Sequence, residues 1–158
     1  AEFLREEPRD HVDPSARGAL IGLRLSHRRH HVIRAVLEGI SLEIRWMLDA
    51  ISRTGVPVEE IRLAGGGSKN KTWNQIHADI LNRPVRTVQN PDAAMVGGAM
   101  CAAVALGVFT DFQQASKAFV ELGPTLNPLP KNAAVYARTY ERYVGLFTLL
   151  SQQRAFAP

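Results

Sequence analysis

The sequence has almost no cysteine and no long hydrophobic run. Its single cysteine, Cys101, lies in an apolar helical pattern. One thiol supports neither a disulfide framework nor a metal cluster built on thiols. No segment approaches the roughly 18 consecutive apolar residues of a transmembrane helix, and no signal peptide is visible. We therefore expect a soluble, cytoplasmic protein without a membrane partner.

The sequence also lacks a concentrated charge of either sign. Nineteen Lys and Arg residues against fifteen Asp and Glu residues give a formal net charge of +4. The basic residues are dispersed and are not interleaved with aromatic ones, so we expect no nucleic-acid partner. A modest positive charge suits a phosphate ligand. With 158 residues, of which 46% are hydrophobic, the chain is long enough for one domain with a core.

The most informative stretch is residues 61–82, in which the hydrophobic period changes at three glycines. A short apolar run ends at Gly65, Gly66 and Gly67, and apolar side chains then recur at helical spacing. Because glycine has no Cβ, a ligand can approach its backbone closely. The amides that open the next helix are unpaired donors at its positive end. The pattern predicts a strand, a turn that suits an anion such as phosphate, and a helix.

Other glycine-rich sites fit these residues less well. A P-loop needs Gly-Lys-Ser or Gly-Lys-Thr, but here the order is Gly67-Ser68-Lys69, and neither tripeptide occurs anywhere in the chain. A Rossmann fingerprint would need a third glycine where the sequence has Asn70, although Asp92 lies at a suitable distance downstream. The Rossmann interpretation therefore stays a weaker alternative, as does a turn that binds nothing.

The remaining elements follow from periodicity and from residues that begin or end helices. We expect helices over residues 32–53, 91–106 (with Asn90 as N-cap) and 112–120, a strand over 85–88, a proline-rich connection over 123–131, and an aromatic-striped helix opened by Asn132. Residues 19–23 suggest a short buried strand or turn. The adjacent Gly97 and Gly98 suggest close packing on the sheet or against a ligand.

Polar residues outside the glycine stretch receive ordinary interpretations. Glu38, Glu43 and Arg45 lie off the apolar stripe of their helix, so we expect them in solvent. Residues 27–31 (HRRHH) carry three histidines at helical spacing, but no carboxylate or thiol accompanies them and two arginines repel a cation. A solvated helix start is favoured over a zinc site.

Several of these segments resemble the FGGY carbohydrate kinases. Residues 18–23 (GALIGL), followed after seven residues by 31–38 (HVIRAVLE), resemble the second signature of that family. Further resemblance, in the same order, lies in residues 65–70 with Trp73, Gln75, Ala78 and Asp79, and in residues 92–94 with 97–99. The similarity spans about residues 3–107, and the GGGSK sequence at 65–69 is most similar to the xylulokinase group.

The resemblance implies an α/β fold: part of an actin-like, ribonuclease-H-like ATPase domain, rich in helices with short parallel strands. Residues 1–158 would be the C-terminal FGGY domain of an ATP-dependent sugar kinase that acts with Mg²⁺ on a pentulose such as xylulose. The amides of Gly65, Gly66 and Gly67 and the side chain of Asn70 would line the ATP pocket, with Ser68 beside them.

By the same resemblance, the catalytic aspartate, the sugar-binding residues and the metal-organising acids lie upstream of Ala1. No catalytic or metal residue is therefore assigned to this chain, and we expect it to be inactive alone. Missing neighbouring strands would leave apolar faces uncovered, so we also expect a homo-oligomer. A stand-alone binding or assembly module derived from this fold is the alternative.

Overall fold

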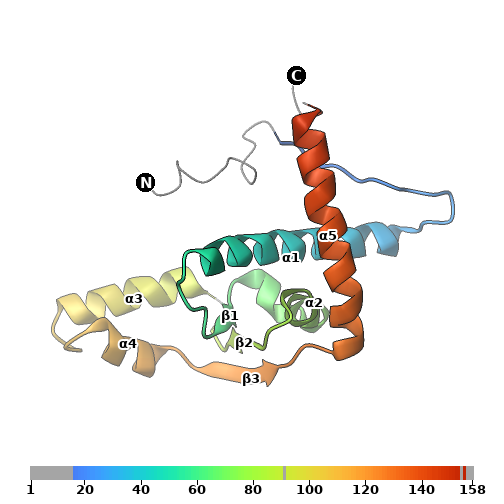
Figure 1. Cartoon of the computed structure of the whole chain (residues 1–158). Helices are drawn as coiled ribbons and strands as arrows, with labels where there is room; N and C mark the ends of the chain where they lie inside the picture. Colours follow the sequence, from blue (N-terminus) through green and yellow to red (C-terminus); the bar gives the residue numbers. More distant parts are fainter. Residues whose placement is uncertain (1–15, 91, 154, 156–158) are drawn as a thin grey trace.

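A computed structural model describes residues 16–90, 92–153 and 155 (Figure 1). Pro91, within the helix expected over residues 91–106, lies outside the described residues. Nine elements follow in order: α1 (Arg29–Arg53), β1 (Ile61–Leu63), the 3₁₀ turn η1 (Gly66–Lys69), α2 (Lys71–Leu81), β2 (Val85–Val88), α3 (Ala93–Ala105), α4 (Phe112–Phe119), β3 (Leu122–Leu126) and α5 (Pro130–Gln152).

The strands form one small mixed sheet in the order β1-β2-β3. The parallel pairing of β1 with β2 confirms the two predicted strands, whereas β3 is antiparallel to β2. Reading residues 123–131 as only a connection was therefore wrong. A Cβ on Gly123 would lie 2.7 Å from the Thr87 hydroxyl, so glycine lets β3 approach β2 closely. The proline of β3, Pro124, lies on an edge strand, where proline is tolerated.

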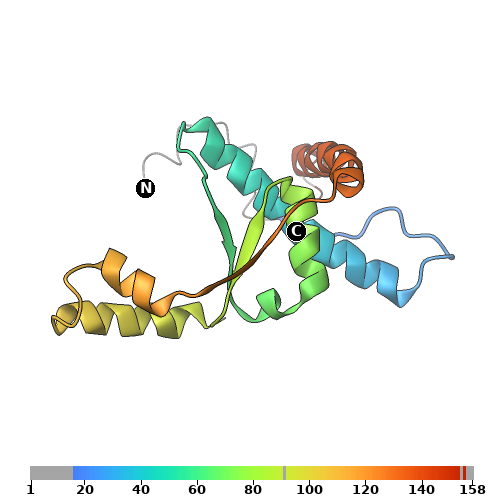
Figure 2. The ribbon, with the colours of Figure 1, turned by 90° about the horizontal axis from the view of Figure 1, so that it is seen from below.

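The core lies between the sheet and three of the helices. Figures 1 and 2 show α1, α2 and α5 together, whereas α3 and α4 extend away as a separate pair. One buried cluster joins α1, α2 and α5 (Leu42, Ile76, Ile80 and Tyr136), and a second joins α2 to β2 (Ala78, Leu81 and Val85). The glycine turn between β1 and α2 is therefore attached to the best-packed part of the molecule.

Hydrogen bonds join the polar residues of α1 to α5 and α2, contrary to the expectation that these residues lie in solvent. The hydroxyl of Tyr136 donates to Glu38 at 2.7 Å, and that of Tyr143 donates to Glu43. Arg45 donates to the carbonyl of Ile80 at 3.0 Å, and its guanidinium lies over the Tyr140 ring. Buried tyrosines need partners for their hydroxyls, and α1 supplies carboxylates.

Two helix starts differ from the sequence interpretation. Helix α3 begins at Ala93, and its N-cap is Asp92, which accepts from the Met95 amide at 3.2 Å. The Asn90 side chain instead accepts from the Asp92 amide. Helix α5 begins at Pro130, because proline suits a first helical position, and not at Asn132.

The histidine-rich segment, residues 27–31, is exposed at the start of α1, as expected. The Nδ1 atoms of His27 and His31 accept from the amides of Arg24 and Arg28. These bonds use one ring nitrogen of each histidine. In the part of the chain that the structure describes, no three His, Cys, Asp or Glu residues are grouped to hold a metal ion.

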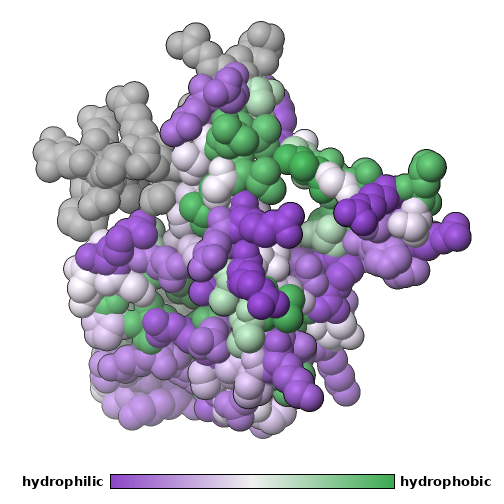
Figure 3. All heavy atoms as spheres, turned by 45° about the vertical axis from the view of Figure 1, so that its right-hand side comes forward, coloured by the Kyte–Doolittle hydropathy of each residue, from purple (hydrophilic) through white to green (hydrophobic). Residues whose placement is uncertain are grey.

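Two segments expose apolar residues that the sequence interpretation had placed inside. Residues 16–25 are exposed throughout, Leu25 completely, so the burial expected for residues 19–23 was wrong. Of the two forms expected there, the structure has a bend at Gly22 and no strand. Figure 3 shows hydrophobic side chains gathered on this projecting segment. Helix α3 has no buried residue among those described. A Cβ on Gly97 or Gly98 would have no described atom within 4 Å, so neither packs on the sheet.

Candidate functional site

The glycine turn, residues 65–70, has the predicted strand, turn and helix on its path. It follows the carboxyl end of β1, and in open α/β sheets ligands bind beyond the carboxyl ends of strands. The Ser68 amide donates to the Gly65 carbonyl at 3.1 Å, and the Asn70 amide donates to the Gly67 carbonyl at 3.0 Å. These bonds make a compact 3₁₀ turn immediately before α2.

The three glycines of the turn serve different purposes. Gly65 has φ of 82°, a conformation that residues with a side chain rarely adopt. Gly67 lies against Trp73: a Cβ there would be 2.7 Å from the ring atom Cζ3. The space beside Gly67, which the sequence interpretation gave to a nucleotide, is therefore partly filled by tryptophan. Gly66 is exposed, and its Cβ would have no described atom within 4 Å.

The polar side chains of the turn help to hold its shape. Ser68 donates its hydroxyl to the Gly65 carbonyl at 2.8 Å, and its own carbonyl accepts from the Asn74 side chain at 2.7 Å. Asn70 caps α2, because its Oδ1 accepts from the Trp73 amide at 3.1 Å. Its Nδ2 is the part of the side chain that can donate to a ligand.

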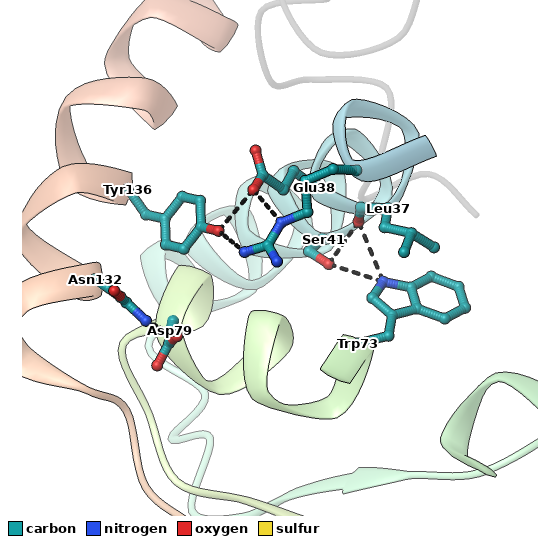
Figure 4. Close-up of polar contacts among 8 residues, drawn as sticks. Leu37, Glu38, Ser41, Trp73, Asp79, Asn132 and Tyr136 are labelled. Atoms are coloured by element: carbon teal, nitrogen blue, oxygen red, sulfur yellow. Dashed lines mark hydrogen bonds and ion pairs between the residues drawn. The ribbon is translucent and has the colours of Figure 1, made fainter. Parts of the chain in front are cut away.

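Trp73 joins the turn to α1. Its indole Nε1 donates to the Leu37 carbonyl at 3.1 Å and lies 3.2 Å from the Ser41 hydroxyl, as Figure 4 shows. Its ring is also stacked on His77, with centroids 5.1 Å apart. The sequence gave Trp73 an apolar position on a helical stripe, and nothing in the sequence identified its partners on α1.

His77 is buried beside this ring, and its Nδ1 has no hydrogen-bond partner among the described residues. Burial penalises the charged imidazolium, which lowers the pKa of His77 below its ordinary value. Its surroundings therefore favour the neutral form of the side chain. The sequence placed His77 on the inward stripe of α2 but gave no indication of a missing partner.

Asp79 explains another part of the motif. It is 2% exposed, and its Oδ1 accepts from Gln75 at 2.8 Å and from the Leu129 amide at 2.7 Å. Its Oδ2 accepts from the Asn132 side chain at 2.7 Å (Figure 4). Gln75 and Asp79 thus attach α2 to the start of α5. These contacts hold two elements of the chain together.

Asp92 and the glycine turn follow the carboxyl ends of two parallel strands, β2 and β1, at the same edge of the sheet. Asp92, which a Rossmann site would use, caps α3 beyond β2. A hollow of about 210 Å³ lies beside the first residues of β1 and β2, where Glu60, Arg83 and Arg86 line it. It is therefore at the opposite end of β1 from the glycine turn.

No helix in the described residues is long and apolar enough to cross a membrane.

A family model and individual relatives both link this chain to carbohydrate kinases. Residues 3–106 match the C-terminal domain of the FGGY family of carbohydrate kinases. The chain is 32% identical over 146 residues to a xylulose kinase of Bacillus subtilis (strain 168), covering 92% of the chain and 29% of that protein. It is 35% identical over 141 residues to a ribulokinase of Geobacillus thermodenitrificans, covering 85% of the chain and 25% of that protein.

A solved structure shows the same relationship in three dimensions. The xylulose kinase from Rhodospirillum rubrum superimposes with a TM-score of 0.78 at 34% identity, covering 92% of this chain and 29% of that chain. The present chain thus spans less than a third of the length of the relatives that it matches.

Proposed function

The chain belongs to the FGGY family of carbohydrate kinases, and on this premise we propose that it is the nucleotide-binding C-terminal part of an ATP-dependent sugar kinase. Structural neighbours in that family have the actin-like, ribonuclease-H-like ATPase fold, of which this chain has the helices and a small mixed sheet. The proposed ligand of the glycine turn is the phosphate chain of ATP.

The observation that carries this proposal is the position of Gly66. It is exposed at the carboxyl end of β1, and the described chain leaves the space of its missing side chain open. Gly65 is explained by its backbone conformation and Gly67 by Trp73, but no described contact requires glycine at position 66. A ligand that approaches the backbone gives a reason for it. Ser68 and Asn70 would lie beside that ligand.

Mg²⁺ is the metal that the family resemblance implies. No three His, Cys, Asp or Glu side chains among the described residues are grouped to hold a metal ion by themselves. Mg²⁺ prefers oxygen ligands and usually binds one or two carboxylates together with substrate phosphates. We assign only phosphate contacts to the turn and derive no step through the metal.

We further propose that the sugar is a pentulose such as xylulose, and that this chain alone does not phosphorylate it. Phosphoryl transfer depends on groups that position the phosphate, stabilise its charge and accept the sugar proton. The glycine turn offers backbone donors but no base. A coupled assay for ADP release, with xylulose and ribulose, should give no sugar-dependent turnover; turnover would contradict the assignment of this chain as an inactive part.

Calorimetry with ATP tests the nucleotide site directly. We expect weak binding to the chain and loss of that binding in Gly66→Val, because the new side chain would occupy the approach to the backbone. Gly145→Val on α5 is a matched control, since a Cβ there also has no described atom within 4 Å. Equal affinity in both variants would argue against the turn. A tight response to NAD instead would favour a Rossmann-type site.

We propose that the exposed apolar surfaces are covered by other parts of the full-length enzyme, and that copies of the isolated chain associate through them. Helix α1 exposes Ile33, Val36, Ile40, Met47 and Ile51, and the segment before it exposes Leu20, Ile21, Leu23 and Leu25. Large exposed apolar patches mark contact surfaces. Light scattering should give a dimer or larger species; a stable particle of 17.4 kDa would instead favour a self-sufficient binding module.

A further inference from the structure

We propose that Trp73 is a positioning residue for the nucleotide: it fixes the position and orientation of the glycine turn relative to α1. This inference rests on the proposed function for its consequence, but the contact itself lies within the chain. It also gives Gly67 a different role from the one expected from the sequence. Gly67 is glycine to admit the Trp73 ring, and Gly66 is glycine to admit the ligand.

The first step is the contact between the turn and the ring. A Cβ on Gly67 would lie 2.7, 3.2 and 3.5 Å from the ring atoms Cζ3, Cε3 and Cη2 of Trp73. Three atoms of the six-membered ring are thus close to one backbone position. Real Cβ atoms almost never approach another heavy atom within 3.0 Å, so any side chain at position 67 must displace the turn or the ring.

The second step is that the ring is not free to move. Its Nε1 donates to the Leu37 carbonyl at 3.1 Å and lies 3.2 Å from the Ser41 hydroxyl. Ser41 is completely buried and donates to the same carbonyl at 2.9 Å. A shift of the ring therefore breaks bonds to buried groups, which costs more than the loss of an exposed bond. Stacking on His77 restrains the ring further.

The third step connects this contact to ligand binding. Ser68 and Asn74 fix the turn relative to α2, whereas Trp73 alone, among these side chains, also bonds to α1. Leu37 belongs to the HVIRAVLE motif, so two motifs of the chain meet at its carbonyl. If the ring moves, the amide of Gly66 changes direction, and a donor that points away from the phosphate loses its bond.

The test compares Trp73→Phe with Trp46→Phe. Phenylalanine keeps an aromatic ring but removes the N–H donor and the outer ring atoms that face Gly67. Trp46, on α1, contacts Tyr143 and Phe147 of α5 and serves as the matched control. We expect Trp73→Phe to shift the amide NMR signals of residues 65–68 and to weaken ATP binding about fivefold. Trp46→Phe should leave both unchanged.

A second variant approaches the same contact from the turn. Gly67→Ala should also shift these signals and weaken ATP binding. In the double variant Gly67→Ala with Trp73→Phe, the added methyl group has room, so its further effect should nearly vanish. Additive effects of the two substitutions would overturn the proposal, as would unchanged turn signals in Trp73→Phe. If the unmodified chain binds no ATP, the proposed function fails, but the NMR comparison still decides whether Trp73 positions the turn.

Discussion

Helices α2 and α3 differ sharply in burial although both carry many apolar residues. Seven of the 11 residues of α2 are buried, including the polar Asn74, His77 and Asp79. Helix α3 is built from alanine, glycine, valine, methionine and cysteine, yet none of its described residues is buried. Burial in this chain therefore follows the presence of a partner element, and apolar composition alone does not produce it.

The same contrast separates two kinds of polar contact. In α2, the Trp73 side chain hydrogen-bonds to α1. The Asp79 side chain hydrogen-bonds to the connection between β3 and α5 and to the first turn of α5. In α3, the described polar contact is the local cap from Asp92 to Met95. Long-range bonds fix α2 in the fold, whereas a local cap only begins a helix. This difference predicts how the two regions respond to substitution.

The largest effect is expected from two matched aspartate substitutions. Asp79→Ala should lower the free energy of unfolding by about 3 kcal/mol, because three donors lose a buried acceptor. Asp92→Ala removes only a helix cap, worth about 1 kcal/mol. Urea unfolding followed by circular dichroism measures both. Equal losses would contradict the assignment of Asp79 to a structural network.

A smaller effect is expected from mild acid, at His77 of α2. The pKa of His77 in the folded protein lies below its ordinary value of 6.5, because burial disfavours the charged form. The unfolded chain therefore binds the proton first as the pH falls, and stability is lost from about pH 7 downward. His77→Gln should lose less stability than the unmodified chain between about pH 7 and pH 5. Parallel pH profiles would show that His77 does not titrate with folding.

The smallest effect, of opposite sign, is expected in α3. Gly98→Ala should raise the free energy of unfolding by about 0.5 to 1 kcal/mol, because the new methyl group meets no described atom and alanine favours a helix. Gly67→Ala, which meets the Trp73 ring, should destabilise the same chain. Destabilisation by Gly98→Ala would reveal a close partner for α3, such as a second copy.

The sequence predicted the elements whose signals are local. Residues 61–82 gave the strand, turn and helix because three glycines interrupt a change of period. Helix α1 ends at Arg53 as expected, and Gly55, with φ of 81°, follows its C-cap. In contrast, β3 was missed because Gly123 and Pro124 are typical of connections, and only its neighbour Thr87 explains the glycine. The pairing of strands far apart in sequence has no local signal.

The candidate site was predictable to a similar extent. Periodicity and glycines located the turn, and the family resemblance suggested its ligand. The distinct roles of Gly65, Gly66 and Gly67 could not be read from three identical letters, because they depend on φ and on the Trp73 ring. Nor could Glu38 be placed against Tyr136, since 98 residues separate them.

The central claim is that the glycine turn binds the phosphates of ATP, and an NMR titration of the chain with ATP tests it most directly. The account predicts that amide signals of residues 65–70 shift first and most, while those of α5 stay in place. Inorganic phosphate should shift part of the same set. Shifts centred on Glu60, Arg83 and Arg86, at the opposite end of β1, or no shifts at all, would contradict the account.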